Sequence, residues 1–463
     1  EISALHELEQ MMLAAKENIG ESRSELEKSV TNLENCLQQI RQKYILDEKQ
    51  CAMEAFRQQF ESGYTWINGF LRNVERFGNR EALAEPESGQ VWTYTQLNAE
   101  ANRFAHALLR SGLQKGDVVM AQLHNCPEFV FAYLACHKIG LVFCPVNFRL
   151  SAKELSGCMD NSCPKVFLME SENQENTDMA LEWAEHAPEI ILSTDSQSEH
   201  SYEKFADGCP ETNPELPWDM YVFDETLRLF TSGTTGRQKS VCLTSINEVL
   251  SAHDVMINFP LSFTDRTMNT TPWFHRGGLH SGGITPTLYA GGTVVIQRKF
   301  QAEQTLDCIE QQGLTFVIGV PNVLELMAEA QQKQPRNLHS LHGIVTMGSP
   351  LERADCIRYQ KILTQRIFNG YGTTETFWNT FLRPDDLPEN AGSAGRACVD
   401  DDVRIVKLYD DHIAKPNDLA ARNGNEVGEV IIRSDAKSAA FYFGNPEETA
   451  KRFHNGFFYT NDL

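Results

Sequence analysis

Apolar residues repeat every seven positions along the first part of the chain. The strict repeat runs through Leu5, Met12, Ile19, Leu26, Leu33 and Ile40. Between residues 26 and 44 a second row of apolar residues makes the spacing alternate between four and three. Sustained heptads are typical of a long amphipathic helix whose apolar stripe packs on a partner. The sequence therefore predicts a helical extension over residues 1–60. Three arrangements of this extension are compatible with the pattern. It pairs with a second copy or a partner helix, it folds back on its own domain, or it is a mobile appendage.

From about residue 61 the pattern changes to short apolar runs that alternate with helical spacing. Residues 118–120 have the composition of a buried strand, and residues 129–150 that of an apolar helix followed by a strand. Alternating strands and helices favour α/β layers. We therefore predict a first α/β subdomain over residues 61–220 and a second over residues 221–384.

Strand patterns separated by turn residues dominate from residue 385 onward. They predict a small β-rich subdomain over residues 385–463. The predicted fold class is thus α/β: two layered α/β subdomains plus a small β-rich subdomain, preceded by a long N-terminal helix.

Composition narrows the range of partners. The 463 residues include 41 Lys and Arg against 63 Asp and Glu, for a net charge of −22. Such a chain is repelled by nucleic acid and by anionic membrane surfaces. No apolar run approaches the ~18 to 20 residues of a membrane-spanning helix, so we expect no integral membrane contact. The 12 cysteines are scattered without a CxxC motif. This pattern predicts reduced thiols, a cytoplasmic protein and no structural metal.

Four hydroxyl side chains and two glycines stand within six consecutive positions after an apolar strand. They are Thr231, Ser232, Gly233, Thr234, Thr235 and Gly236, and Lys239 follows. Glycines let backbone N–H groups approach phosphate, hydroxyls add donors, and the cation offsets charge. The spacing is not that of a Walker A loop. Taken alone, the segment fits a phosphate cradle or an ordinary polar turn equally well.

Three further segments have candidate chemistry. Residues 368–375 read Phe-Asn-Gly-Tyr-Gly-Thr-Thr-Glu, which offers a stacking face and a hard oxygen pair suited to Mg²⁺. Residues 272–278 place an aromatic-His pair before a glycine-rich turn. Asp462 follows an aromatic strand, where a carboxylate can bind a ribose diol. Taken singly, the three segments are better explained as a tight turn, a buried histidine and a solvated chain end.

Taken together in this order, the segments resemble the adenylate-forming (AMP-binding) acyl-CoA synthetase family. That family shares an architecture with luciferases and with the adenylation domains of non-ribosomal peptide synthetases. Its phosphate loop reads Thr-Ser-Gly-Thr-Thr-Gly-x-Pro-Lys-Gly, and residues 231–240 match it in eight of ten places. The departures are Gln238 for Pro and Ser240 for Gly. The family's Tyr-Gly-x-Thr-Glu block matches residues 371–375 completely.

Other landmarks of the family extend the resemblance to about residues 62–463. The Pro-x-Phe-His block is met at residues 272–275, and Asp462 falls in the Tyr-x-Thr-Gly-Asp block with Asn461 in place of Gly. Minor matches include residues 348–351 and the Pro-Glu-Glu-Thr run at 446–449. No departure removes a charged side chain or a ligand side chain, so we expect an active enzyme.

The resemblance implies two half-reactions: a carboxylic acid attacks ATP to give an acyl-adenylate and pyrophosphate, and the thiol of CoA then displaces AMP. ATP, Mg²⁺ and CoA are the implied cofactors. The implied catalytic residues are Lys239 on the phosphates, His275 as a gate to the thiol tunnel, Thr374 at the α-phosphate and Glu375 as the Mg²⁺ ligand. Tyr371 is implied to stack on adenine and Asp462 to bind the ribose. The remaining implied nucleotide contacts come from the 231–236 loop and from Gly348, Ser349, Pro350, Asn369, Gly372 and Thr373.

The acid itself is not named by the sequence. Gly277 and Gly278 leave room for a bulky or ring-bearing acid, and Arg276 either meets a polar group on that acid or has a structural role. Family members continue past the Asp block into a small C-terminal lid with a reactive-site Lys. This chain stops at Leu463, so we expect the lid in the full protein. The alternatives are an adenylation domain that loads a carrier protein, and a non-catalytic acyl- or nucleotide-binding scaffold.

Overall fold

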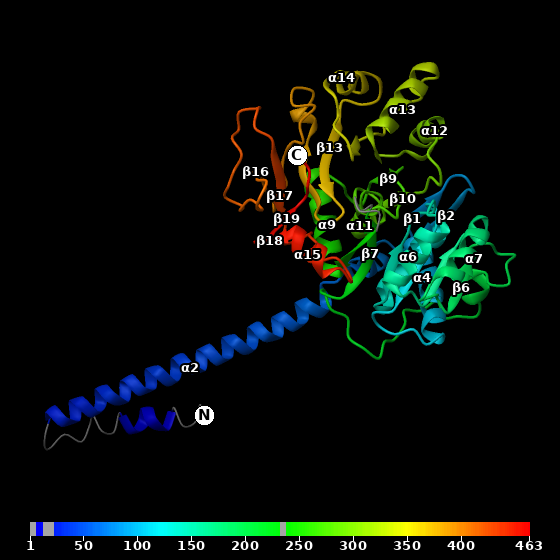
Figure 1. Ribbon diagram of the computed structural model, residues 1–463. Helices are drawn as coiled ribbons and strands as arrows, with labels where there is room; N and C mark the ends of the chain where they lie inside the picture. Colours follow the sequence, from blue (N-terminus) through cyan, green and yellow to red (C-terminus); the bar gives the residue numbers. More distant parts are fainter. Residues whose placement is uncertain (1–5, 13–22, 232–237) are drawn as a thin grey trace. The chain divides into compact units, whose positions relative to one another are not determined.

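The computed structural model describes residues 6–12, 23–231 and 238–463, with the side chains of residues 23–25 excepted (Figure 1). The chain divides into two compact units, Glu1–Gly63 and Tyr64–Leu463. No helix among the described residues is both long enough and apolar enough to cross a bilayer.

The first unit is dominated by α2 (Arg23–Gly63), a helix of 41 residues. Leu37 is buried, and Arg41 forms an ion pair with Glu9 of the helical segment 6–12. The heptad stripe of the first half of α2 is therefore partly covered within this unit. The second half exposes Leu46, Met53, Phe56 and Phe60. At about 100° per residue, these four lie on roughly the opposite side of the helix from the 26–44 stripe. The predicted long N-terminal helix is confirmed.

The second unit is built on three sheets among the described residues. The largest has nine strands, in the spatial order β15 (Arg396–Ala397), β14 (Phe377–Leu382), β13 (Ile367–Thr373), β12 (Gly343–Met347), β11 (Phe316–Gly319), β9 (Arg266–Asn269), β10 (Thr293–Val295), β1 (Glu81–Glu85) and β2 (Gln90–Thr93). Its interior strands from β13 to β1 are parallel, and β14, β15 and β2 are antiparallel additions at the two edges.

The other two sheets are smaller. The six-stranded sheet has the order β6 (Ile190–Ser193), β5 (Val166–Met169), β3 (Val118–Gln122), β4 (Val142–Pro145), β7 (Glu225–Thr231) and β8 (Lys239–Thr244). The four-stranded sheet is antiparallel throughout, with the order β16 (Asp402–Lys407), β17 (Gly428–Arg433), β19 (Phe457–Tyr459) and β18 (Phe453–His454). The predicted α/β fold class with a β-rich C-terminal part is confirmed.

Helices separate many of the strands along the chain. Those of the second unit are α3 (Trp66–Phe77), α4 (Tyr94–Arg110), α5 (Pro127–Ile139), α6 (Ala152–Ser162), α7 (Gln174–Trp183), α8 (Tyr202–Phe205), α9 (Ser245–Asn258), α10 (Arg276–His280), α11 (Ile284–Ala290), α12 (Ala302–Gln312), α13 (Pro321–Lys333), α14 (Arg353–Ile362) and α15 (Pro446–Arg452). The sequence sets several of their starts: Thr93 with Gln96, and Ser151 with Glu154, form capping boxes at α4 and α6.

Sheet membership does not follow the boundary predicted at residue 220. Strands β1 and β2 lie in the nine-stranded sheet with strands from beyond residue 260, whereas β7 and β8 complete the six-stranded sheet. Local alternation of strands and helices reveals that a parallel sheet forms, but not which sheet a given strand joins. The subdomain boundaries remain predictions.

A buried carboxylate joins three helices of the second unit, α5, α9 and α10. Glu248 of α9 accepts hydrogen bonds from the Tyr133 hydroxyl at 2.8 Å and from His137 Nε2 at 2.6 Å, both on α5. His280 Nε2 lies 3.6 Å from the other carboxylate oxygen. Burial alone would raise the pKa of Glu248, but the His137 and His280 side chains lower it to about 2.

The lowered pKa of Glu248 predicts that the folded state loses stability at acid pH. Because its pKa is lower in the folded state, the stabilisation is complete above the unfolded pKa of about 4.5 and is lost as pH falls toward 2. In Glu248→Gln we expect the free energy of unfolding to fall by about 1–3 kcal/mol at pH 7 and to depend less on pH below about 4.5. Urea unfolding across this range measures both effects. Glu329→Gln, which changes an exposed carboxylate, is the control. Parallel pH curves for wild type and Glu248→Gln would contradict the assignment.

Candidate active site

The two ends of the predicted phosphate loop meet at the edge of the six-stranded sheet. Thr231 ends β7, Lys239 begins β8, and the two residues pair across the antiparallel register. The predictions for the loop residues between them, Ser232, Gly233, Thr234, Thr235 and Gly236, lie outside the described residues. The hairpin nevertheless fixes where the loop leaves and re-enters the sheet.

Lys239 is a nearly buried cation with an anionic partner. Its side chain is 9% exposed, and Nζ donates a hydrogen bond to Glu448 on α15. The ammonium also lies 5.4 Å from the centre of the Tyr442 ring. The hydrogen bond from Lys239 holds the pKa of Glu448 below its usual value, so this carboxylate is ionised at neutral pH.

The segment 367–375 places its chemistry at the end of β13. Tyr371 donates a hydrogen bond through its hydroxyl to Asp462 Oδ2 at 2.6 Å, across 91 residues of sequence. Burial, followed by this contact with Asp462, raises the pKa of Tyr371, which therefore stays protonated. Asn461 has a positive φ of 66°, which agrees with the tolerance expected of asparagine at this position. Two motifs far apart in sequence thus meet at one surface.

Glu375 lies behind this surface and is 8% exposed. The Tyr442 hydroxyl donates to Glu375 Oε1 at 2.5 Å, and the Ala439 amide donates to the Glu375 carbonyl at 2.8 Å. Burial, with Glu375 adding to it, raises the pKa of Tyr442, so the phenol remains a donor. Tyr442 therefore contacts two charged residues of the predicted site, Lys239 on its ring face and Glu375 at its hydroxyl.

A small cavity of about 200 Å³ is lined by Gly372, Thr373 and Thr374, the residues that precede Glu375. Its walls come from α10, from the ends of β12 and β13, and from β14: Thr271, His275, Arg276, Gly277, Ser281, Val320, Met347, Gly348, Gly370, Gly372, Thr373, Thr374, Phe377 and Trp378. Because β12 and β13 are parallel neighbours, the segment 348–350 and the segment after Asn369 emerge at the same sheet edge. The structure thus gathers Gly348, Gly372, Thr373, Thr374 and His275 around one space.

The guanidinium of Arg276 is buried and bonded to other parts of the protein. Its Nη1 donates to the Thr374 carbonyl at 2.6 Å, and Nη2 donates to the Lys437 carbonyl at 2.6 Å and to Ser251 Oγ at 3.3 Å. Desolvation lowers the pKa of Arg276 to about 9, so the guanidinium remains charged at neutral pH. Of the two roles left open by the sequence, these contacts favour the structural one, because they fix the turn that holds Thr374.

Tyr442 and Glu448 were not identified as site residues from the sequence. The Pro-Glu-Glu-Thr run at 446–449 marks their neighbourhood, but no local pattern reveals contacts with residues about two hundred positions earlier. Glu448 lies 209 residues from Lys239. Only the folded chain brings them together.

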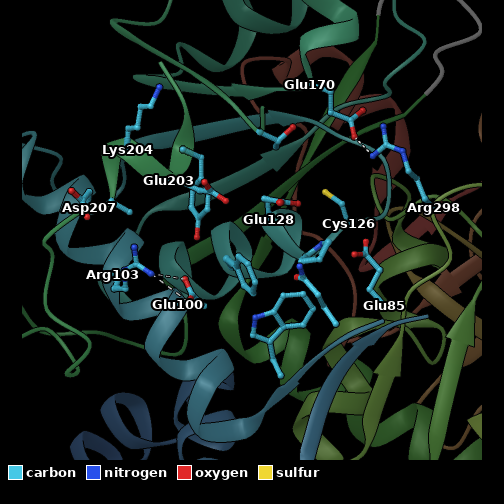
Figure 2. Close-up of a pocket in the computed structure, with 17 residues that line it drawn as sticks. Glu85, Glu100, Arg103, Cys126, Glu128, Glu170, Glu203, Lys204, Asp207 and Arg298 are labelled. Carbon is cyan, nitrogen blue, oxygen red and sulfur yellow. Dashed lines mark hydrogen bonds and ion pairs between the residues drawn. The ribbon is translucent and has the colours of Figure 1, made fainter. Parts of the chain in front are cut away.

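A larger cavity of about 780 Å³ lies elsewhere in the second unit (Figure 2). Six of its lining residues are acidic and three are basic: Glu85, Glu100, Glu128, Glu170, Glu203 and Asp207 against Arg103, Lys204 and Arg298. Burial raises the pKa values of Glu100 and Glu128. An excess of carboxylates repels polyphosphates, so this cavity is unsuited to ATP or CoA.

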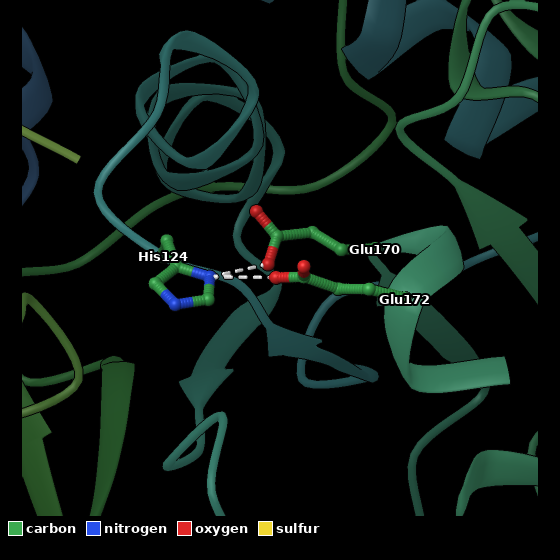
Figure 3. Close-up of side chains that lie close together, drawn as sticks. All are labelled: His124, Glu170 and Glu172. Atoms are coloured by element: carbon green, nitrogen blue, oxygen red, sulfur yellow. Dashed lines mark hydrogen bonds and ion pairs between the residues drawn. The ribbon is translucent and has the colours of Figure 1, made fainter. Parts of the chain in front are cut away.

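At its edge, His124 donates through Nδ1 to Glu170 Oε2 at 2.6 Å, and Glu172 lies 3.4 Å from the same nitrogen (Figure 3). These residue types suit a divalent cation, and their candidate ligand atoms lie within 4.8 Å of one another. However, Arg298 forms ion pairs with both Glu170 and Glu172. The guanidinium already neutralises these carboxylates and would repel a metal ion, so we interpret the cluster as an ion-pair network between three loops.

Comparison with known proteins agrees with the geometry. Residues 70–442 match the model of the family described as AMP-binding enzyme. The indoleacetate–CoA ligase of Aromatoleum aromaticum is 31% identical over 86% of this chain and 75% of its own length. The fatty acid–[acyl-carrier-protein] ligase ScoC of Streptomyces coeruleorubidus is 28% identical over 81% of this chain and 70% of its own length.

A solved structure gives the same result. The inhibitor-bound N-terminal domain of FACL13 from Mycobacterium tuberculosis superposes with a TM-score of 0.75 at 26% identity, over 86% of this chain and 96% of that domain. The family suggested by the ordered motifs, and its enzymatic character, are confirmed. The chain belongs to the AMP-binding enzyme family.

Proposed function

We propose that the chain activates a carboxylic acid with ATP, releasing pyrophosphate and forming an acyl-adenylate, and then transfers the acyl group to the thiol of CoA. The observation that carries the proposal is the arrangement at the end of β13. Thr374 lines the small cavity, and its neighbours on the same segment contact the other predicted residues. Tyr371 bonds to Asp462, and Glu375 bonds to Tyr442, whose ring centre lies 5.4 Å from Lys239 Nζ.

The chemistry explains these residue types. A carboxylate that attacks a triphosphate brings two anions together, so catalysis depends on positioning and on charge stabilisation. In the proposed arrangement Lys239 and the 231–236 loop bind the β- and γ-phosphates, and Thr374 contacts the α-phosphate. Tyr371 stacks on adenine and Asp462 accepts hydrogen bonds from the ribose hydroxyls. Gly348, Ser349, Pro350, Asn369, Gly372 and Thr373 complete the proposed nucleotide contacts.

Glu375 is the residue that fits Mg²⁺. Magnesium in phosphate-transfer sites is usually bound by one or two carboxylates together with substrate phosphates. Glu375 supplies one such carboxylate, which is fixed in orientation by the Tyr442 hydroxyl. When bound, the ion supplies positive charge to the polyphosphate.

The cavity supports a compact, ring-bearing acid as the substrate class. Phe377 and Trp378 form an aromatic wall, and Gly277 and Gly348 line the cavity without side chains. A Cβ atom at Gly277 would come within 2.9 Å of Met347 Sδ, so this glycine preserves room inside the cavity. The similarity to an indoleacetate–CoA ligase agrees with an aromatic acid. His275 at the wall of the cavity is the proposed gate for the incoming thiol.

A carrier protein is the second candidate acceptor. The similarity to ScoC, a ligase whose name specifies an acyl-carrier protein, favours it directly. The chemistry of adenylation is the same in both cases, so the difference concerns only the thiol that receives the acyl group. The 12 free cysteines support the cytoplasm as the location for either reaction.

The acceptor and the acid are tested together. We expect pyrophosphate exchange to depend on an added ring-bearing carboxylic acid, and AMP release to rise when CoA is supplied. A panel of aromatic, short aliphatic and long-chain acids, assayed with CoA, with a phosphopantetheinylated carrier protein and with neither, measures both properties. Release stimulated by the carrier protein alone favours the second candidate. Absence of exchange with every acid would contradict the proposed function.

Glu375→Ala separates the metal role from nucleotide binding. We expect a loss of about 10²–10³ in the rate of Mg²⁺-dependent adenylation, the size typical of one lost electrostatic group. AMP binding should change much less, because AMP brings less charge to neutralise. Exchange assays across Mg²⁺ concentrations and calorimetry with AMP measure the two quantities. Equal losses in both would argue against a metal ligand.

We also propose that α2 pairs with a second copy through the face that carries Leu46, Met53 and Phe56. The apolar side chains of this face are exposed within the first unit, whereas the 26–44 stripe is partly covered. Met53→Glu combined with Phe56→Glu should therefore lower the molar mass measured by light scattering, because buried charges destabilise a helix interface. Gln58→Glu is the matched control on the same helix. An unchanged mass in the double variant would exclude pairing through this face.

A further inference from the structure

We propose that Glu448 is a built-in counter-ion of Lys239, which the β- and γ-phosphates of ATP displace, and that Arg452 keeps the released carboxylate. This inference rests on the proposed function, in which Lys239 binds the phosphates. It gives α15, a helix outside the predicted site, a role in the binding of ATP and the release of pyrophosphate.

Two cations share one carboxylate, so Glu448 keeps a cationic partner if one of them is taken by another anion. Lys239 Nζ donates to Glu448 Oε1, and Arg452 Nε donates to the same oxygen at 3.2 Å from the next turn of α15. All three side chains are largely buried, with 9%, 15% and 14% exposed for Lys239, Glu448 and Arg452. Asn445 caps α15 by accepting from the Glu448 amide at 3.0 Å, which fixes the start of the helix.

The residues just before α15 also contact Glu375, another charged residue of the site. Tyr442 lies under the Lys239 ammonium and donates its hydroxyl to Glu375. Its neighbour Phe443 donates its amide to the Ser240 carbonyl at 2.9 Å, next to Lys239 on β8. The single stretch from Tyr442 to Glu448 therefore contacts both Lys239 and Glu375.

Charge balance requires an exchange when polyphosphate binds. Phosphate oxygens at Lys239 would face the Glu448 carboxylate across the same ammonium, and two anions at that distance repel each other in a poorly solvated site. If Glu448 turns from Lys239 to Arg452, both anions keep a cation and no buried charge is left unpaired. AMP has no β- or γ-phosphate, so its binding does not require this exchange.

The exchange has a functional consequence. Competition by Glu448 weakens the hold of Lys239 on pyrophosphate, which is a product of the first half-reaction. The carboxylate is ready to recombine with Lys239 as pyrophosphate leaves. Glu448 is in this sense a positioning residue that favours product release and keeps Lys239 neutralised between turnovers.

Glu448→Gln in the full chain tests the proposal. The amide keeps the size of the side chain but removes the competing charge. Calorimetry should therefore show pyrophosphate and ATP binding about five- to tenfold tighter in the presence of Mg²⁺, the size of one charged hydrogen bond partly offset, with AMP changed by less than about twofold. Glu447→Gln is the matched control, because Glu447 is 81% exposed and pairs with Lys451 rather than Lys239.

Arg452→Gln should change the affinity for pyrophosphate in the opposite direction to Glu448→Gln. Without a second cation, the released carboxylate has no partner, so pyrophosphate should bind more weakly than to wild type while AMP binding is unchanged.

Weaker polyphosphate binding by Glu448→Gln, or equal changes for ATP and AMP, would overturn the proposal and indicate a purely structural role. A melting temperature close to that of wild type shows that either variant is folded. If Glu448→Gln does not fold, Arg452→Gln decides alone, and tighter or unchanged pyrophosphate binding overturns the proposal. Wild-type protein that binds neither ATP nor AMP would instead refute the proposed function.

Discussion

Two buried cations hold the turn on which the site depends. Arg276 donates to the carbonyls of Thr374 and Lys437, each at 2.6 Å. Lys437 in turn donates to the Trp378 carbonyl at 2.6 Å and pairs with Asp401 at 2.8 Å and Asp254 at 3.0 Å. Buried charges are tolerated only when they are paired or hydrogen-bonded, so these contacts are obligatory once the chain folds. They fix the backbone that carries Thr374 and Glu375 before any ligand arrives.

Such preorganisation matters because the reaction joins two anions. Groups that are already oriented toward developing charge need no reorganisation at the moment of reaction. The chain as a whole has a net charge of −22, which opposes the binding of a polyphosphate. Among the described residues, the lining of the cavity of about 200 Å³ contains Arg276 and no carboxylate. This differs from the acidic cavity of Figure 2, where carboxylates outnumber cations.

The sequence predicted those parts of the fold and site that depend on local pattern. Heptads indicated α2. The resemblance implied that Tyr371 and Asp462 serve one nucleotide; the structure joins the two side chains by a hydrogen bond, and their roles stay a prediction. Contacts between distant segments were not predictable. The bond from Tyr442 to Glu375 spans 67 residues, and no spacing rule encodes it. Likewise, the assignment of β1 and β7 to different sheets depends on long-range packing rather than on local alternation.

A crystal structure with a non-hydrolysable acyl-adenylate analogue that carries an aromatic acyl group tests the central claim most directly. The account predicts adenine against Tyr371, the ribose hydroxyls at Asp462, and the acyl ring inside the cavity of about 200 Å³ between His275 and Trp378. An analogue bound in the acidic cavity beside Glu128, or an acyl group directed away from His275, would contradict it.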